Sequence, residues 1–113
     1  MENTHGTDLY VVIERYTPAP GKLDEVLSMT NDIGKTLHGF EGLLMLQVLK
    51  PSGSKGDVVS TATWESEAAF KGFMQSDAVK DLMKSDAFSK MQELTTSSSF
   101  DGFSLVSGWH AAH

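Results

Sequence analysis

The chain has 113 residues, of which 40% are apolar and 21% charged, and it contains no cysteine. These values predict one globular domain over residues 1–113, with 1–8 and 110–113 as flexible ends, and they exclude disulfides and thiolate metal sites. The net charge of −6, with no basic stripe and no long apolar run, excludes nucleic-acid and membrane partners, so the expected location is the cytoplasm.

Residues 9–16 predict the first strand, because they are rich in β-branched and aromatic side chains. The two-residue period of a strand places Tyr10, Val12, Glu14 and Tyr16 on one face. A carboxyl group therefore stands in the middle of an otherwise apolar and aromatic row.

Residues 21–37 predict an amphipathic helix, because apolar side chains recur at steps of three and four. Residues 42–50 then form a nearly continuous apolar run, which is typical of a strand that is buried on both faces. A sheet with helices on one side only would leave its other face in water. We therefore expect a second copy of the chain to cover that face.

Residues 57–64 predict a third strand, and Ser66 follows as the N-cap of a second helical region. Two Ser-Asp-Ala triplets, which begin at Ser76 and Ser85, indicate that this region contains two further helix starts.

A polar loop at 95–99 and a last strand at 103–109 complete the predicted elements. The order is then strand, helix, strand, strand, helix, strand, which is the order of a ferredoxin-like α+β domain. In this fold the sheet is antiparallel and the helices cover one of its faces.

Glu14 is the first candidate for a catalytic group. Burial beneath the helices would raise its pKa and suit a general base, whereas a solvated position would make it a partner of Arg15 or of a lysine. Tyr10 and Tyr16 are candidates to hydrogen-bond the oxygens of a substrate, or else they pack on the sheet with their hydroxyls at its edge.

Apolar side chains of the strands and of the second helical region are candidates to line a pocket. They are Val12, Trp64, Phe73, Met74 and Met83. Their alternative role is core packing, which is the usual role of a helical stripe of this kind. His38 is either a proton shuttle at a pocket mouth or a surface residue near a helix end.

Three motifs follow one another along the chain: Gly-Phe-x-Gly at 39–42, Trp-Glu-Ser-x-x-Ala-Phe at 64–70 and Ser-Asp at 76–77. Together they resemble the pattern of antibiotic-biosynthesis-monooxygenase domains, over about residues 10–82. The resemblance implies a ferredoxin-like subunit that pairs with a second copy into a dimeric α+β barrel.

Within that family the sequence is most similar to the haem-degrading branch. Members of this branch carry an Asn on the first strand, and a Trp and a haem-ligating His on the second helix. These positions fall on Glu14, Phe73 and Met83 here, or on Gln92 for the His in a second register. The other branch consists of cofactor-free oxygenases of flat aromatic substrates, in which the substrate itself supplies the electrons.

The resemblance thus implies a homodimeric, cofactor-independent monooxygenase that acts on a planar aromatic or quinone-like molecule, without a metal site. Two alternatives remain. One is a haem-binding or haem-degrading relative with altered ligation, in which Met83 occupies the ligand position. The other is a dimeric module that binds a small ligand without catalysis.

Overall fold

The computed structural model describes residues 2–5 and 8–111. A four-stranded antiparallel sheet forms one layer of the molecule. Its strands are β2 (Tyr10–Pro18), β3 (Leu43–Leu49), β4 (Val58–Trp64) and β5 (Thr95–Ser104), in the spatial order β3-β4-β2-β5. Within this sheet β2 comes first along the chain and β5 last, and the two lie side by side with β5 at the edge, as the ferredoxin-like order requires.

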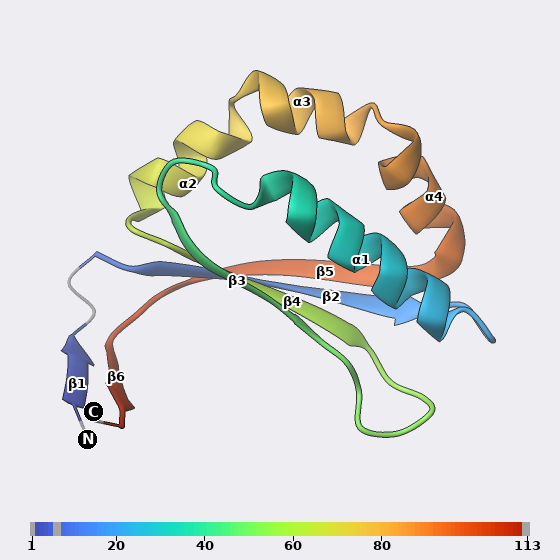
Figure 1. Ribbon diagram of the computed structural model, residues 1–113, viewed down its shortest axis with the longest axis horizontal. Helices are drawn as coiled ribbons and strands as arrows, with labels where there is room; N and C mark the ends of the chain where they lie inside the picture. Colours follow the sequence, from blue (N-terminus) through green and yellow to red (C-terminus); the bar gives the residue numbers. More distant parts are fainter. Residues whose placement is uncertain (1, 6–7, 112–113) are drawn as a thin grey trace.

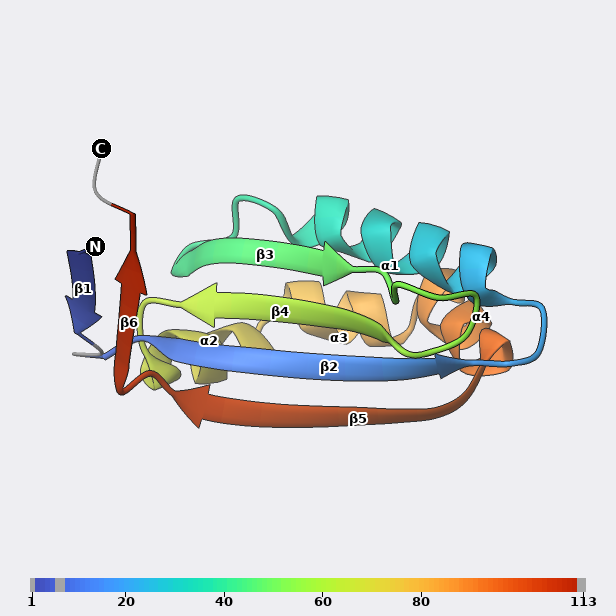
Figure 2. The ribbon, with the colours of Figure 1, turned by 90° about the horizontal axis from the view of Figure 1, so that it is seen from below.

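Helices form the second layer, and all of them lie on the same face of the sheet (Figure 1). They are α1 (Leu23–Leu37), α2 (Glu67–Met74), α3 (Asp77–Met83) and α4 (Asp86–Leu94). This arrangement confirms the predicted α+β ferredoxin-like fold. The opposite face of the sheet carries no helix, as the view from below shows (Figure 2).

Serine side chains divide the second helical region into three short helices. Ser76 Oγ donates to the carbonyl of Phe73 at 2.6 Å and accepts the N–H of Val79 at 3.4 Å, so it ends one helix and begins the next. Ser85 repeats the pattern and donates to the carbonyl of Leu82 at 2.5 Å. Both helix starts that the Ser-Asp-Ala triplets predicted are confirmed.

The predicted end of the chain is wrong in its boundaries. Residues 95–99 form no loop but the first half of β5, which pairs with β2 along its length. Their side chains are polar because β5 is an edge strand whose side chains are largely exposed there, so the hydrophobic alternation that marks a half-buried strand is missing. The strand predicted at 103–109 is divided between β5 and β6.

A separate two-stranded pair extends from one end of the main sheet (Figure 1). It consists of β1 (Glu2–His5) and β6 (Ser107–His110), which run antiparallel. The sequence did not predict β1, because a four-residue polar segment carries no strand signal. The expected flexibility of the two ends falls partly on residues 1, 6–7 and 112–113, which lie outside the described residues.

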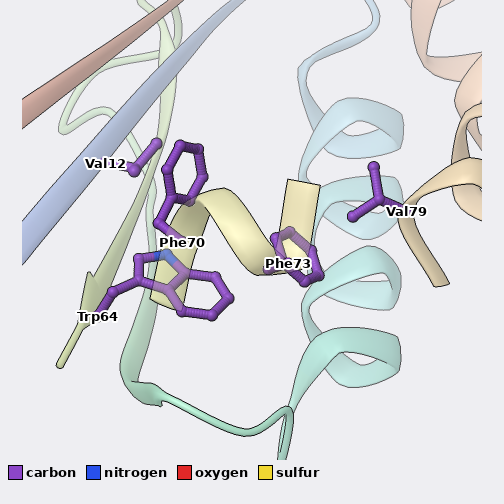
Figure 3. Packing of buried hydrophobic residues seen from close by; sticks show 5 residues of the cluster. All are labelled: Val12, Trp64, Phe70, Phe73 and Val79. Atoms are coloured by element: carbon purple, nitrogen blue, oxygen red, sulfur yellow. The ribbon is translucent and has the colours of Figure 1, made fainter. Parts of the chain in front are cut away.

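Two clusters of buried side chains hold the helices to the sheet. One contains Val12, Trp64, Phe70, Phe73 and Val79, and it is drawn in Figure 3. The other lies nearer the opposite end of the sheet and contains Val26, Val58, Met91 and Leu94. Each such side chain stabilises the fold by about 1.5–3 kcal/mol when fully buried.

The helix-free face of the sheet exposes large apolar side chains. Met45 of β3 and Phe103 of β5 point to this face and are 53% and 51% exposed. The backbone register places Thr63 and Val11 between them, so the four residues form one row across the sheet. Within a single chain the apolar run of residues 42–50 is therefore half-buried on the helix side and exposed on the other, so the predicted burial on both faces is absent from the single chain.

Candidate functional site

A small cavity lies between the sheet and the helix layer, with a volume of about 80 Å³. Its walls are formed by the inward side chains of all four strands of the main sheet, by α1 and by α2. The lining residues are Val12, Glu14, Tyr16, Thr30, Ile33, Gly34, Leu37, Leu43, Leu46, Ser60, Ala62, Trp64, Phe70, Phe73, Met74 and Phe100. The surroundings are almost wholly apolar, and Glu14 supplies the only carboxyl among them.

Glu14 lies in the middle of β2 and lines this cavity together with Val12 and Tyr16, which the strand alternation placed on the same face. The hydroxyl of Tyr16, two residues further along the same face, donates a hydrogen bond to Glu14 Oε2 at 2.5 Å. Burial raises the pKa of the Glu14 carboxyl, and the hydrogen bond from Tyr16 opposes that rise in part. A carboxyl in this state holds its proton more tightly than an exposed one, which is the property of a stronger base.

The Tyr16 hydroxyl serves as a fixed donor. Its pKa is raised by burial and by the neighbouring Glu14 carboxylate, both of which disfavour a phenolate. Tyr16 therefore keeps its proton and orients one carboxylate oxygen of Glu14. The other oxygen remains available to a molecule in the cavity.

Trp64 contributes a donor without an acceptor. The residue is 2% exposed, and its Nε1–H has no hydrogen-bond partner among the described residues. In Figure 3 the ring nitrogen lies on the edge of the indole nearest Phe70, and both residues line the cavity. An unpaired buried N–H is destabilising by about 1–3 kcal/mol, so this donor beside the cavity is free to meet an acceptor.

The register of the sheet sets the separation between Glu14 and Trp64, whose polar groups border the cavity. Trp64 pairs with Tyr10, and Glu14 pairs with Ser60, four residues further along. Four residues of strand correspond to about 13 Å between backbone positions. Glu14 and Trp64 therefore reach into the cavity from its two ends.

Ten of the lining residues were not predicted as site residues from the sequence, and Ser60 and Phe100 are two of them. Ser60 lies opposite Glu14 on β4, and Phe100 lies opposite it on β5. Phe100 stacks on Phe70 with ring centroids 5.8 Å apart, which closes the side of the cavity. The strand alternation could have identified Ser60, whereas Phe100 was missed because the start of β5 was predicted as a loop.

Of the predicted pocket residues, Val12, Trp64, Phe73 and Met74 line the cavity. Met83 is not among its lining residues, because α3 turns this side chain outward, where it is 54% exposed.

Tyr10, predicted as a catalytic candidate, does not line the cavity either. Its ring packs on Phe70 with centroids 5.5 Å apart and lies over Gly102 of the neighbouring strand. A side chain at residue 102 would overlap this ring, so the glycine makes room for it. In this position Tyr10 supports Phe70 and so supports the cavity wall.

The residues present do not fit a haem group. The family position of the iron ligand is taken by Met83, which is exposed and outside the cavity, and among the described residues no histidine lines the cavity. Across the described residues no group of three or more His, Asp or Glu side chains could hold a metal ion. Nor does any described helix have the length and apolarity to cross a bilayer.

Comparison with known proteins gives one sequence family and many similar structures. The model of the family described as antibiotic biosynthesis monooxygenase matches residues 9–85. No curated protein matches the chain. Among solved structures, a mutant of SnoaB, a cofactor-independent oxygenase from Streptomyces nogalater, superposes with a TM-score of 0.70 and 16% identity, over 88% of this chain and 94% of that one.

Two further structures show the same fold. PA3566 from Pseudomonas aeruginosa has a TM-score of 0.69 at 13% identity, over 91% of this chain and 99% of that one. Rv0793 from Mycobacterium tuberculosis has a TM-score of 0.69 at 14% identity, over 87% and 95%. At these identities the likeness is one of fold, and reaction chemistry has to be argued from the site itself.

Proposed function

The chain belongs to the antibiotic biosynthesis monooxygenase family, and we propose that it is a cofactor-independent monooxygenase that oxidises a planar aromatic molecule in the cavity between sheet and helices. One observation carries the proposal: a carboxyl of raised pKa and a buried N–H without a partner line the same apolar cavity. SnoaB, which shares the fold, is described as a cofactor-independent oxygenase.

Oxygenation without a cofactor proceeds on electrons from the substrate. Glu14 removes a proton from a ring carbon, and the electron pair left behind spreads to an oxygen substituent of the ring. Trp64 Nε1–H donates a hydrogen bond to that oxygen as its negative charge grows. The two groups thus act on one substrate from the two ends of the cavity.

The carbanion then reduces O2, and a carbon–oxygen bond forms. The proton held by Glu14 goes to the terminal peroxide oxygen, so the intermediate is a hydroperoxide. Loss of water from this hydroperoxide takes the second hydrogen of the same carbon and leaves a carbonyl. One atom of O2 enters the product and the other leaves as water, and all electrons come from the substrate.

The apolar walls serve this chemistry in two ways. They exclude water from the carbanion, and they hold a flat ring system edge-on between Glu14 and Trp64. Tyr16 keeps the carboxyl of Glu14 in place by its hydrogen bond. No step requires haem or flavin.

Anthrone is a suitable probe, because this planar three-ring ketone loses a proton from its central carbon to give an aromatic enolate. Its oxygenation consumes one O2 for each anthraquinone formed. We expect Glu14→Gln to lower the rate by about 100-fold, as for loss of a general base, and Trp64→Phe to lower it by about 10-fold. Glu93→Gln, which changes an exposed carboxyl on α4, is the matched control and should leave the rate unchanged.

Three outcomes would separate the possible functions. Full activity of the Glu14→Gln protein would contradict the proposed base. Saturable binding of anthrone without oxygen uptake would favour a non-catalytic binding module. A stoichiometric, shifted absorption band on addition of haemin would favour the haem-binding alternative.

We also propose that the helix-free face of the sheet packs on a second copy of the chain, giving the dimeric α+β barrel that the family resemblance implies. The support is the exposed apolar row that includes Met45 and Phe103, since monomeric proteins rarely leave such patches in water. A solution mass of twice 12.3 kDa at micromolar concentration is the expected result.

A further inference from the structure

We propose that the substrate enters the cavity through the seam between α1 and β3, where Leu46 closes against Gly34, and that an anionic substituent of the substrate stays outside this seam on Lys35 and His38. The proposal deepens the proposed function, on which it rests for the nature of the ring inside the cavity. It specifies the entry route of the substrate, Leu46 as the residue that gates this route, and a negative charge on the substrate.

The first observation is that a surface groove and the inner cavity share one wall. The groove runs along the outer side of α1 and β3, is open to solvent in the single chain and has a volume of about 590 Å³. Its lining includes Met45, which also belongs to the exposed row on the helix-free face. Three residues line both the groove and the cavity: Gly34, Leu43 and Leu46. Nothing but these residues is common to the two linings, so the wall between solvent and cavity is thinnest there.

The second observation concerns the helix that forms one side of the seam. Two neighbouring stripes of α1 face different spaces. The cavity stripe consists of Thr30, Ile33 and Leu37. The groove stripe consists of Asn31, Lys35 and His38. Gly34 stands between them and borders both spaces, so the helix presents no side chain at the point where the two meet.

Leu46 occupies the room that this glycine leaves. A Cβ at residue 34 would lie 3.0 Å from Leu46 Cδ2, which means that the leucine methyl packs directly on the helix backbone. β3 is an edge strand of the sheet (Figure 2), so no neighbouring strand holds Leu46 from the outer side. Rotation of this side chain would open the wall beside Gly34, and Leu43 is the other side chain that lines both spaces.

The sizes of the two spaces indicate how a ligand is divided between them. A cavity of about 80 Å³ accepts little more than the ring that meets Glu14 and Trp64. The remainder of a larger molecule must lie in the groove, which is several times larger and continuous with the seam.

The charge of the groove indicates the chemistry of that remainder. Its lining contains Lys35, His38 and the amide of Asn31 but no carboxyl, although the chain as a whole has a net charge of −6. Among the described residues, Lys35 makes no ion pair. A lysine without an ion pair, in a lining that has no carboxyl, fits a carboxylate or another anionic substituent.

A matched pair of probes tests the anion. 2-Naphthol and 6-hydroxy-2-naphthoate carry the same ring and hydroxyl, and only the second has a carboxylate at the far end. Tight-binding titrations followed by tryptophan fluorescence give both dissociation constants. We expect the naphthoate to bind about three- to fivefold more tightly, as for a partly exposed ion pair, and Lys35→Gln to remove this preference. Lys90→Gln, on the exposed side of α4, should preserve it.

Stopped-flow association rates test the gate. We expect Leu46→Ala to bind 2-naphthol several-fold faster, and Gly34→Ala to bind it more slowly because the added methyl clamps Leu46. Leu37→Ala is the control, because Leu37 lines the cavity but not the groove. This variant enlarges the cavity by a similar amount without opening the seam, so its association rate should stay near that of the wild type.

The outcomes distinguish the route from the proposed function. Equal acceleration by Leu46→Ala and Leu37→Ala, with no preference for the naphthoate, would overturn the route even if anthrone is oxygenated. Selective acceleration by Leu46→Ala together with a Lys35-dependent preference would support it even if no oxygen is consumed. A monomeric mass for the Lys35→Gln protein beside a dimeric wild type would make the groove a subunit interface and would also overturn the proposal.

Discussion

Gly102 of β5 offers a direct test of how firmly the Tyr10 ring is held at the end of the cavity. A Cβ at this position would lie 2.5 Å from Tyr10 Cζ and 3.1 Å from Cε2, with the hydroxyl oxygen closer still. These atoms belong to one rigid ring, so the ring cannot bend away at its tip. Gly102→Ala must therefore displace the whole ring from its contact with Phe70, 5.5 Å away between centroids.

The expected magnitude follows from two opposing effects. Overpacking of this kind is destabilising by about 1–3 kcal/mol, and replacing a strand glycine by alanine returns about 0.5–1 kcal/mol through the unfolded state. We expect a net loss of about 1–2 kcal/mol. For a domain of this size that corresponds to a fall in Tm of about 4 °C or more.

Urea and thermal unfolding followed by circular dichroism would measure the change. Gly72→Ala is the control of opposite sign, because a Cβ there meets nothing within 4 Å and the residue lies inside α2. It should stabilise the protein by about 0.5–1 kcal/mol. The decisive comparison is Gly102→Ala in a Tyr10→Val background, where the loss should disappear. An equal loss in both backgrounds would refute the steric reasoning.

Three further predictions concern the site, a helix cap and the dimer. Burial raises the pKa of Glu14 in the folded protein. The contribution of this carboxyl to the free energy of unfolding is therefore fully present at low pH, and it is lost as the pH rises past 4.5, the ordinary pKa of a glutamate. Glu14→Gln should therefore be the more stable protein at pH 8, with the difference closing towards pH 4, and a constant difference in Tm across that range would contradict the assignment. Ser66→Ala should destabilise the protein by about 1 kcal/mol, since Ser66 Oγ accepts the N–H of Ala69 at 3.0 Å, and unchanged urea unfolding would show that α2 does not need its cap. Phe103→Asp should halve the solution mass measured by light scattering, because it places a charge in the exposed apolar row, and an unaltered dimer would mean that another surface pairs the subunits.

Much of the fold could be predicted from local patterns in the sequence. Alternation placed Glu14 and Val12 on one common face of β2, and the serine triplets located the starts of α3 and α4. These features were predictable because each depends on a strand period or a cap within a few residues. β5 was missed at its start because residues 95–99 are held by backbone pairing with β2, and that contact leaves no mark on their side chains.

Only part of the site could be predicted from the sequence. The sequence showed that Glu14 shares a face with Val12 and Tyr16, but not that this face meets the helices. The unpaired N–H of Trp64 depends on which acceptors surround a buried ring. Met83 was placed in the pocket by its apolar character, although the turn at Ser76 rotates α3 and leaves that side chain outside. Packing between elements that are distant in sequence determines both the missing acceptor of Trp64 and the outward position of Met83.

The two serine joints that divide the second helical region have a consequence for how this layer bends over the sheet. At each joint one hydroxyl donates to a carbonyl of the helix before it and accepts an N–H of the helix after it. The helical layer therefore changes direction twice without leaving these two backbone groups unpaired. Between the joints, α3 keeps one buried side chain, Val79, in the core cluster with Trp64 and Phe73.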